Sequence, residues 1–196
     1  DAIEVNISCP NIEDDGKAFA MRPEPTFQVM KKLKSVTGVP LWAKLTPNTG
    51  ETIEVAKAAE EAGTDALVVS NTVLAMQIDI NTFKPSLGNI MGGLSGPAIK
   101  PIVLRMVYQC NKIVSIPIIG CGGIASAEDA IEFIIAGATA VQVGTATFIN
   151  PLTMVSVISD FEIYCRKKGI ERVSDLIGKV NDQNTPDNAA LIEVDV

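Results

Sequence analysis

The stretch Ala2-Ile3-Glu4-Val5-Asn6-Ile7-Ser8-Cys9-Pro10-Asn11 opens the chain and indicates its fold. Its apolar residues alternate with polar Glu4 and Asn6, which is the period of a β-strand. Pro10 has no backbone N–H and therefore ends the hydrogen-bonded ladder. Amide, hydroxyl and thiol groups thus gather at the carboxyl end of a strand, which is the edge where α/β proteins bind ligands.

A strand-to-helix alternation continues along the chain. The five expected strands cover about residues 2–7, 41–45, 66–71, 116–120 and 140–144. Helices are expected at about residues 23–37, 51–62, 98–114, 126–137 and 150–168. This regular alternation predicts right-handed crossovers and a parallel sheet. Polar or glycine residues follow nearly every strand, as they do around the rim of a (β/α)8 TIM barrel.

The helical patterns also predict which residues face inward. In the first helix the inward stripe is expected at Phe27, Met30, Leu33 and Val36, with Gly38 as the terminating glycine. In the third helix it is expected at Ile99, Ile102, Val103, Met106 and Cys110. Pro151 is expected in the first turn of the last helix.

Residues 72–96 form a long excursion between the expected strand at 66–71 and the expected helix at 98–114, with a small hairpin expected around Ile78 and Pro85. Excursions of this length are usually functional lids or disordered segments.

Composition narrows the possible functions. The 196 residues favour one domain, and the net charge of -7 argues against nucleic acid or an anionic membrane surface as a partner. No apolar run reaches the length of a membrane span and no signal peptide is visible, and the four scattered cysteines are typical of reduced thiols in the cytoplasm. The chain has no histidine, so proton transfer must fall to Cys, Lys, Tyr or a carboxylate. No metal site is expected.

Two glycine-containing turns are typical of a phosphate cradle. Gly120-Cys121-Gly122-Gly123 precedes a helix capped by Ser126, and Gly144-Thr145 follows the last strand. Glycines let backbone N–H groups approach phosphate oxygens, and barrels often bind phosphate after their last two strands. The alternative is a pair of tight turns that require glycine for geometry alone.

Other polar residues allow two interpretations each. Lys44, inside an apolar strand, faces either solvent or an anionic ligand, and the cradle favours the ligand. Cys9 is either a small buried apolar residue or a reactive thiol, and its polar loop favours the thiol. Asn71 is either a cap for Thr72 or a ligand-binding amide, and Asn6 is either a satisfied strand-end amide or a second such group.

Six motifs resemble those of the dihydroorotate dehydrogenase family and follow in that family's order between residues 2 and 180. They are Asn6-Ile7-Ser8-Cys9-Pro10-Asn11, Ala43-Lys44-Leu45-Thr46-Pro47-Asn48, Ser70-Asn71-Thr72, Gly92-Gly93-Leu94-Ser95-Gly96-Pro97-Ala98-Ile99-Lys100-Pro101, Ile119-Gly120-Cys121-Gly122-Gly123 and Val143-Gly144-Thr145. Cys9 is similar to class 1, since class 2 has serine there. The fourth motif resembles the NAD-linked class 1B. Dihydropyrimidine dehydrogenase has a related domain, but usually carries histidine at the position of Asn11.

The resemblance implies a full eight-stranded barrel, of which residues 1–180 would supply about strands 4 to 8. Residues 181–196 form a polar tail without an assigned role. The chain begins with Asp1 and runs at once into a core strand, so we expect it to be part of a longer protein.

The resemblance also implies an activity, the FMN-dependent oxidation of dihydroorotate to orotate in the pyrimidine pathway to UMP. Cys9 would be the catalytic base, and Lys44 would offset negative charge on the reduced flavin. The substrate-binding residues would be Asn6, Asn11, Asn71 and Thr72. The FMN-binding residues would be Asn6, Lys44, Ser70, Gly96, Gly122, Gly123, Gly144 and Thr145. In class 1B the electrons pass to a partner subunit that carries FAD and an iron–sulfur cluster, so a homo- or hetero-oligomer is expected.

Two other functions compete with this interpretation. One is a phosphate-binding lyase or isomerase on the same type of barrel, which would be colourless because it needs no flavin. The other is a non-catalytic barrel fragment that serves folding or assembly.

Overall fold

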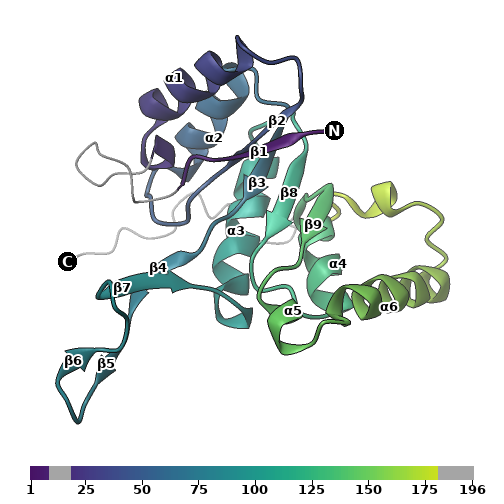
Figure 1. Ribbon diagram of the computed structural model, residues 1–196. Coiled ribbons are helices and arrows are strands. Elements are labelled where there is room, and N and C mark those ends of the chain that lie inside the picture. The colour runs from purple at the N-terminus through teal and green to yellow at the C-terminus, as the bar shows by residue number, and fades with distance from the viewer. Residues whose placement is uncertain (9–18, 181–196) are drawn as a thin grey trace, which may run out of the picture.

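Five parallel strands form the main sheet of the protein (Figure 1). A computed structural model describes residues 1–8 and 19–180. The strands lie in the order β1 (Ile3–Asn6), β2 (Leu41–Lys44), β3 (Ala66–Val69), β8 (Ile118–Cys121) and β9 (Ala140–Gln142). The parallel sheet and the five strands predicted from the sequence are therefore confirmed.

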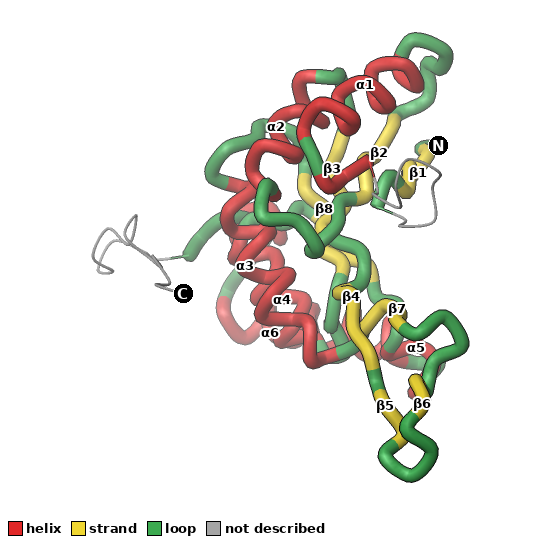
Figure 2. The backbone as a smooth tube through the Cα atoms, turned by 90° about the vertical axis from the view of Figure 1, so that its left-hand side faces the viewer, coloured by secondary structure: helices red, strands yellow, loops and turns green. Residues whose placement is uncertain are grey.

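The helices that connect these strands lie along one side of the sheet (Figure 2). They are α1 (Pro23–Lys34), α2 (Thr52–Glu61), α3 (Lys100–Asn111) and α4 (Ala127–Ala136), and the short α5 (Ala146–Ile149) and α6 (Thr153–Lys168) follow the last strand. Three 3-10 turns accompany them, η1 (Phe19–Met21), η2 (Pro97–Ile99) and η3 (Val173–Leu176). Strand order follows chain order, so every right-handed crossover places its helix on the same face, as in a barrel and unlike a doubly wound sheet.

The helix-covered face of the sheet forms the main core. It contributes fully buried side chains such as Ala43, Leu67 and Val69, which pack with Val103 of α3 and Phe133 of α4. Among the residues that the structure describes, no helix covers the opposite face in the views of Figures 1 and 2. Ala66, Val68 and Ile119 form a small buried cluster there, with Trp42 and Cys121 half-buried against it.

The sheet is strongly curved around this second face. Gln142 on β9 donates a hydrogen bond of 2.7 Å to Glu4 on β1, although β1 and β9 are the two outer strands. Adjacent strands lie about 4.8 Å apart, so a flat sheet would separate these strands by about 19 Å. Two side chains of this length cannot bridge that distance. Glu4 and Gln142 therefore meet across a concave face, which corresponds to the interior of a barrel.

Residues 72–95 leave the sheet as a projecting arm (Figures 1 and 2). In it β4 (Val73–Met76) pairs with β7 (Met91–Leu94), and β5 (Ile78–Asp79) pairs with β6 (Lys84–Pro85). The hairpin predicted around Ile78 and Pro85 is confirmed by the pairing of these two residues. The longer β4–β7 ladder was not predicted, because neither strand has the alternating pattern that identifies a half-buried strand.

The start and the end of helix α4 agree with the positions predicted from the sequence. Ser126 caps α4 in a reciprocal capping box with Asp129, and Gly137 ends the helix with a φ of 124°.

Four expectations about helix ends and faces are wrong. Helix α1 ends at Lys34 with Ser35 as its C-cap, so Gly38 lies beyond it and Val36 is 76% exposed. Ile102 is 38% exposed, because Val103 and Met106 already fill the inward stripe of α3. Helix α6 begins at Thr153, whose hydroxyl donates to the Asn150 carbonyl at 2.6 Å, so Pro151 precedes the helix.

Within residues 1–8 and 19–180, none of the helices is both long and apolar enough to span a lipid bilayer.

Candidate functional site

A cavity of about 170 Å³ opens at the carboxyl ends of β2, β3, β8 and β9. Segments far apart in the chain line it, including the base of the arm and the start of η2. Seven of the eight residues expected to bind a cofactor lie there, namely Lys44, Ser70, Gly96, Gly122, Gly123, Gly144 and Thr145. The eighth, Asn6, lines a neighbouring cavity.

The glycine turn after β8 presents bare backbone to this cavity. Gly122 and Gly123 have φ angles of 152° and 78°, which residues with a side chain rarely adopt. A Cβ on Gly123 would lie 2.8 Å from the Lys100 backbone nitrogen and 2.9 Å from the Gly96 carbonyl oxygen. The turn therefore requires glycine for its geometry, and the same glycines leave the backbone open to a ligand.

Charged side chains hold the residues that directly follow this glycine turn. Asp129 accepts hydrogen bonds from the backbone N–H groups of Ala125 and Ser126, each at 2.9 Å. Its other oxygen lies 2.7 Å from the Lys100 ammonium, which also pairs with Glu132 at 3.0 Å. Burial raises the pKa of Asp129, but these hydrogen bonds and the Lys100 charge outweigh it and hold the pKa below its usual value. The two carboxylates raise the pKa of Lys100.

A second cavity, of about 350 Å³, adjoins the first and shares Asn71 and Thr72 with it. Its lining is rich in amide and hydroxyl groups and consists of Asn6, Ser8, Asn48, Asn71, Thr72, Leu74, Asn89, Met91, Gly92 and Gly93. Three of the four predicted substrate-binding residues therefore come together here. The fourth, Asn11, and the predicted base Cys9 lie outside the described residues.

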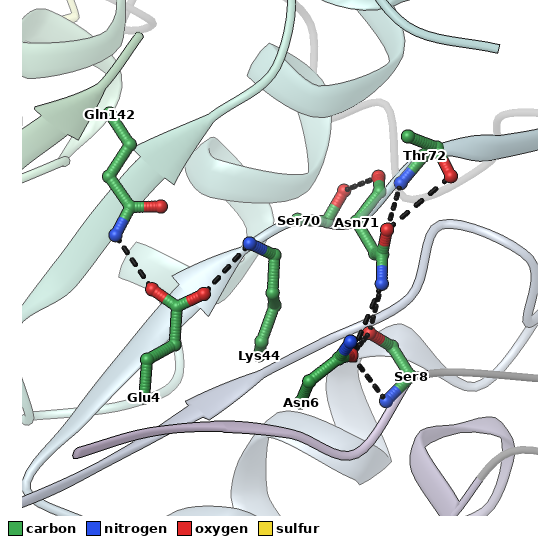
Figure 3. Close-up of polar contacts among 8 residues, drawn as sticks. All are labelled: Glu4, Asn6, Ser8, Lys44, Ser70, Asn71, Thr72 and Gln142. Atoms are coloured by element: carbon green, nitrogen blue, oxygen red, sulfur yellow. Dashed lines mark hydrogen bonds and ion pairs between the residues drawn. The ribbon is translucent and has the colours of Figure 1, made fainter. Parts of the chain in front are cut away.

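A hydrogen-bond network fixes the amides at the ends of β1 and β3 (Figure 3). The Asn71 side-chain amide donates to the Ser8 hydroxyl at 2.7 Å and to the Asn6 oxygen at 3.2 Å. The Asn71 oxygen accepts from the Thr72 backbone N–H at 2.7 Å. Asn71 is thus a cap for Thr72 and Asn6 is a satisfied strand-end amide, and both also line the second cavity.

Sequence reasoning did not single out Asn48, which connects the loop after β2 to the arm. Its side chain donates to the Thr72 carbonyl at 3.1 Å and accepts from the Leu74 N–H at 2.8 Å. Asn48 therefore sets the position of Thr72 at the boundary of the two cavities. Its place at the end of the Lys44 motif, directly after a proline, was the available signal.

The second residue that sequence reasoning missed is Glu4, on the concave face. Its carboxylate lies 2.8 Å from the Lys44 ammonium and accepts from Gln142 at 2.7 Å (Figure 3). Burial raises the pKa of Glu4, but the hydrogen bonds from Gln142 and Lys44 and the Lys44 charge outweigh it, so the pKa lies below its usual value. Lys44, which lines the first cavity, is therefore already paired with a carboxylate.

Cys121 lies beside this ion pair. It lines the first cavity and a third one of about 520 Å³ on the concave side, and Lys44 and Gly144 also line both. Burial raises the pKa of the Cys121 thiol, which favours the protonated, unreactive form.

The chemistry of the site follows from these groups. The glycine turns offer backbone to an anion such as phosphate, and the amides offer donors and acceptors to a small polar molecule. The Lys44 cation lines the first cavity between these two regions. Among the described residues, no cluster of three or more His, Cys, Asp or Glu side chains could hold a metal ion.

A curved parallel sheet with its ligand cavities along the carboxyl rim defines an α/β protein of the barrel type. The chain belongs to the dihydroorotate dehydrogenase family, because a sequence model of that family matches residues 1–163. The family predicted from the six motifs is therefore confirmed.

Three relatives illustrate the similarity, and each is named dihydroorotate dehydrogenase B (NAD(+)), catalytic subunit. The protein of Caldicellulosiruptor saccharolyticus is 50% identical over 181 residues, which are 92% of this chain and 60% of the relative. That of Geobacillus sp. is 50% identical over 91% of this chain and 57% of its own length. The protein of Alkaliphilus oremlandii is 51% identical over 92% of this chain and 60% of its own length. The chain thus spans about three fifths of the length of the relatives it matches.

Proposed function

We propose that this chain carries most of the active site of an FMN-dependent dihydroorotate dehydrogenase of the NAD-linked class 1B. The observation that carries the proposal is the single cavity that collects seven predicted cofactor residues from distant segments. The adjoining amide-rich cavity supports a small polar substrate. The NAD-linked class rests on the names of the relatives.

The chain would supply about strands 4 to 8 of an eight-stranded barrel through residues 1–180, with residues 181–196 as a tail. The singly wound strand order and the contact between Glu4 and Gln142 across the concave face support this assignment. The concave face has only a small apolar cluster of its own, as expected when further strands complete it.

The residues present fit FMN. The backbone of Gly122, Gly123, Gly144 and Thr145 would hold the phosphate, because glycine turns of this shape leave N–H groups accessible. Ser70 and Gly96 would complete the wall of the cofactor site, and Lys44 would lie toward the flavin ring, with Asn6 on the substrate side. FMN, when bound, accepts a hydride from the substrate.

The chain's own groups would bind the substrate and move its proton. Asn6, Asn71 and Thr72, with Asn11, would hydrogen-bond the carboxylate and ring amides of dihydroorotate. Cys9, which directly follows Ser8 in the sequence, would take the proton from the carbon next to the one that gives up the hydride. A thiol is mostly protonated at neutral pH, so the site must favour the thiolate of Cys9.

The electrons would leave through a partner subunit that brings FAD and an iron–sulfur cluster. The relatives' designation as catalytic subunits supports a partner of this kind. A cytoplasmic location remains a prediction from the sequence.

A visible absorption spectrum of the purified chain, with and without added FMN, tests the proposal. We expect a flavin spectrum that bleaches when dihydroorotate is added without oxygen. A flavin spectrum that does not bleach would contradict the substrate. After unbound FMN is removed by gel filtration, a chain that stays colourless shows either that it needs the further strands of the barrel to hold FMN or that its glycine turns bind another phosphate-containing ligand. The same measurement on the full-length protein separates the two, and a colourless full-length protein would favour a phosphate-binding lyase or isomerase.

Replacement of Cys9 tests the proposed base. Cys9→Ala should abolish turnover and leave the flavin spectrum unchanged, whereas Cys9→Ser should leave slow turnover that improves at high pH. Cys165→Ala on α6 is the matched control, since Cys165 lines neither the proposed cofactor cavity nor the proposed substrate cavity. Unchanged turnover of Cys9→Ala would remove Cys9 as the base.

A further inference from the structure

The concave face of the sheet contains an ion pair that the proposed reaction does not use directly. Lys44 on β2 and Glu4 on β1 lie on neighbouring strands, with their charged groups 2.8 Å apart. The side chains are 20% and 28% exposed, so both are substantially removed from solvent. Such a pair is better shielded from water than the surface ion pairs of the helices, such as Glu162–Arg166.

Glu4 has a second support that is independent of Lys44. One carboxylate oxygen accepts from the Lys44 ammonium, and the other accepts from the Gln142 side-chain amide at 2.7 Å. Lys44 holds the carboxylate from the neighbouring strand β2, and Gln142 on β9 holds it from the opposite edge of the curved sheet (Figure 3). A carboxylate fixed in this way cannot follow Lys44 if the lysine turns toward a ligand.

Lys44 is the residue of this trio that matters for ligand binding. It lines both the first cavity and the third one, whereas Glu4 lines neither. A free ammonium would present a full positive charge to an anion in these cavities. An ammonium paired with a fixed carboxylate presents a much weaker one, and it gives up its position less readily.

We propose that Glu4 is a positioning residue for Lys44: supported by Gln142, its carboxylate holds the Lys44 ammonium on the concave face and offsets its charge there. Where the cavities hold flavin, as the proposed function has it, Glu4 thereby limits how far Lys44 stabilises the reduced, negatively charged ring. The reduction potential of the flavin is then set by the pair and not by the lysine alone.

The first test needs no cofactor. The chain is acetylated with a limiting amount of acetic anhydride, and the modification of each lysine is measured by mass spectrometry. In Glu4→Gln we expect Lys44 to react at least about threefold faster than in the unchanged chain, because the neutral amide holds the ammonium less firmly. Lys100, which is paired with Asp129 and Glu132, is the internal reference and should not change.

Glu4→Gln removes the negative charge and keeps groups that can make the same hydrogen bonds. The new amide can still accept from Lys44, and Gln142 can turn its own amide to offer an oxygen in place of its NH2 group. Gln142→Ala leaves the charge and removes one support, so it should raise Lys44 reactivity by less. Glu61→Gln, at the exposed end of α2, makes the same change in net charge and should have no effect. Equal Lys44 reactivity in all four proteins would overturn the proposal.

The second test uses the protein loaded with FMN. Glu4→Gln should shift the midpoint potential of the flavin to more positive values, and Glu61→Gln should leave it unchanged. A shift in both variants, or in neither, would contradict the charge-offsetting role. If neither the chain nor the full-length protein takes up FMN, the proposed function fails, and the acetylation result alone decides whether Glu4 holds Lys44.

Discussion

The two faces of the same sheet differ in almost every respect. The helix-covered face is a continuous apolar core, and neighbouring strands contribute Leu67, Val69 and Ile118 to it. The concave face has three fully buried apolar residues and otherwise carries Glu4, Lys44 and Gln142. One strand therefore packs in the core through every second residue and presents polar side chains on the concave face through residues between them. We expect substitutions on the first face to act mainly on stability, and those on the second mainly on the site.

The largest expected difference comes from two adjacent isoleucines on β8. Ile118 is 2% exposed and belongs to the main core, whereas Ile119 is 7% exposed and belongs to the small cluster on the concave face. Ile118→Ala should lower the free energy of unfolding by about 2–5 kcal/mol, and Ile119→Ala by less than about 2 kcal/mol, since the smaller cluster can relax or admit water. Denaturant titration measures both, and equal losses would mean that the two faces are packed alike.

A smaller effect is expected from the glycines at the rim. Gly123→Ala places a Cβ against the backbone of Lys100 and Gly96 at a positive φ, which should cost about 1–3 kcal/mol of unfolding free energy. Gly144→Ala is the control, because no atom lies within 4 Å of its would-be Cβ, and its effect should stay within about 0.5 kcal/mol. Unfolding curves of both variants measure this. A similar loss in both would show that the turn after β8 has no special constraint.

Acid should weaken the ion pair on the concave face. The pKa of Glu4 is lower in the folded protein than its usual value of 4.5, so Glu4 adds stability above that pH, and the contribution is lost as pH falls through the folded pKa. Unfolding midpoints measured between about pH 3 and pH 6 should therefore fall less steeply in Glu4→Gln. An unchanged slope would mean that the ion pair on the concave face contributes no stability.

The smallest effect is expected on the outer surface of the helices. The Glu162–Arg166 pair on α6 is 62% and 76% exposed, so Arg166→Ala should change the free energy of unfolding by less than about 0.5 kcal/mol. A loss comparable with that of Ile119→Ala, measured by the same titration, would contradict this ranking of the surfaces.

The sequence predicted those structural features whose patterns are visible over a few neighbouring residues. The five strands and the α4 capping box were found because short alternating or continuously apolar runs and cap spacing are visible within a few residues. Val36 was misplaced because a helical stripe does not reveal where the helix ends. Seven residues predicted to bind the cofactor, on the basis of the family resemblance, line one cavity because parallel strands bring their carboxyl ends to one edge.

Glu4 could not be found in this way. Along the chain it is only the polar partner in an alternating strand, and its role depends on the curvature that brings Gln142 to it. Asn48 was missed for a related reason, since its partners Thr72 and Leu74 are fixed by the arm, whose ladder has no alternating pattern.

The contact between Glu4 and Gln142 also has a consequence for folding. It joins residues 138 positions apart, so it closes the longest loop among the described side-chain hydrogen bonds. Long loops cost the most chain entropy to close, and we expect the concave face to form after the helix-covered core. Pulsed hydrogen exchange during refolding would contradict this if amides of β1 and β9 were protected as early as those of β3. If the helix-covered core does form first, a newly made chain becomes stable before its concave face is complete.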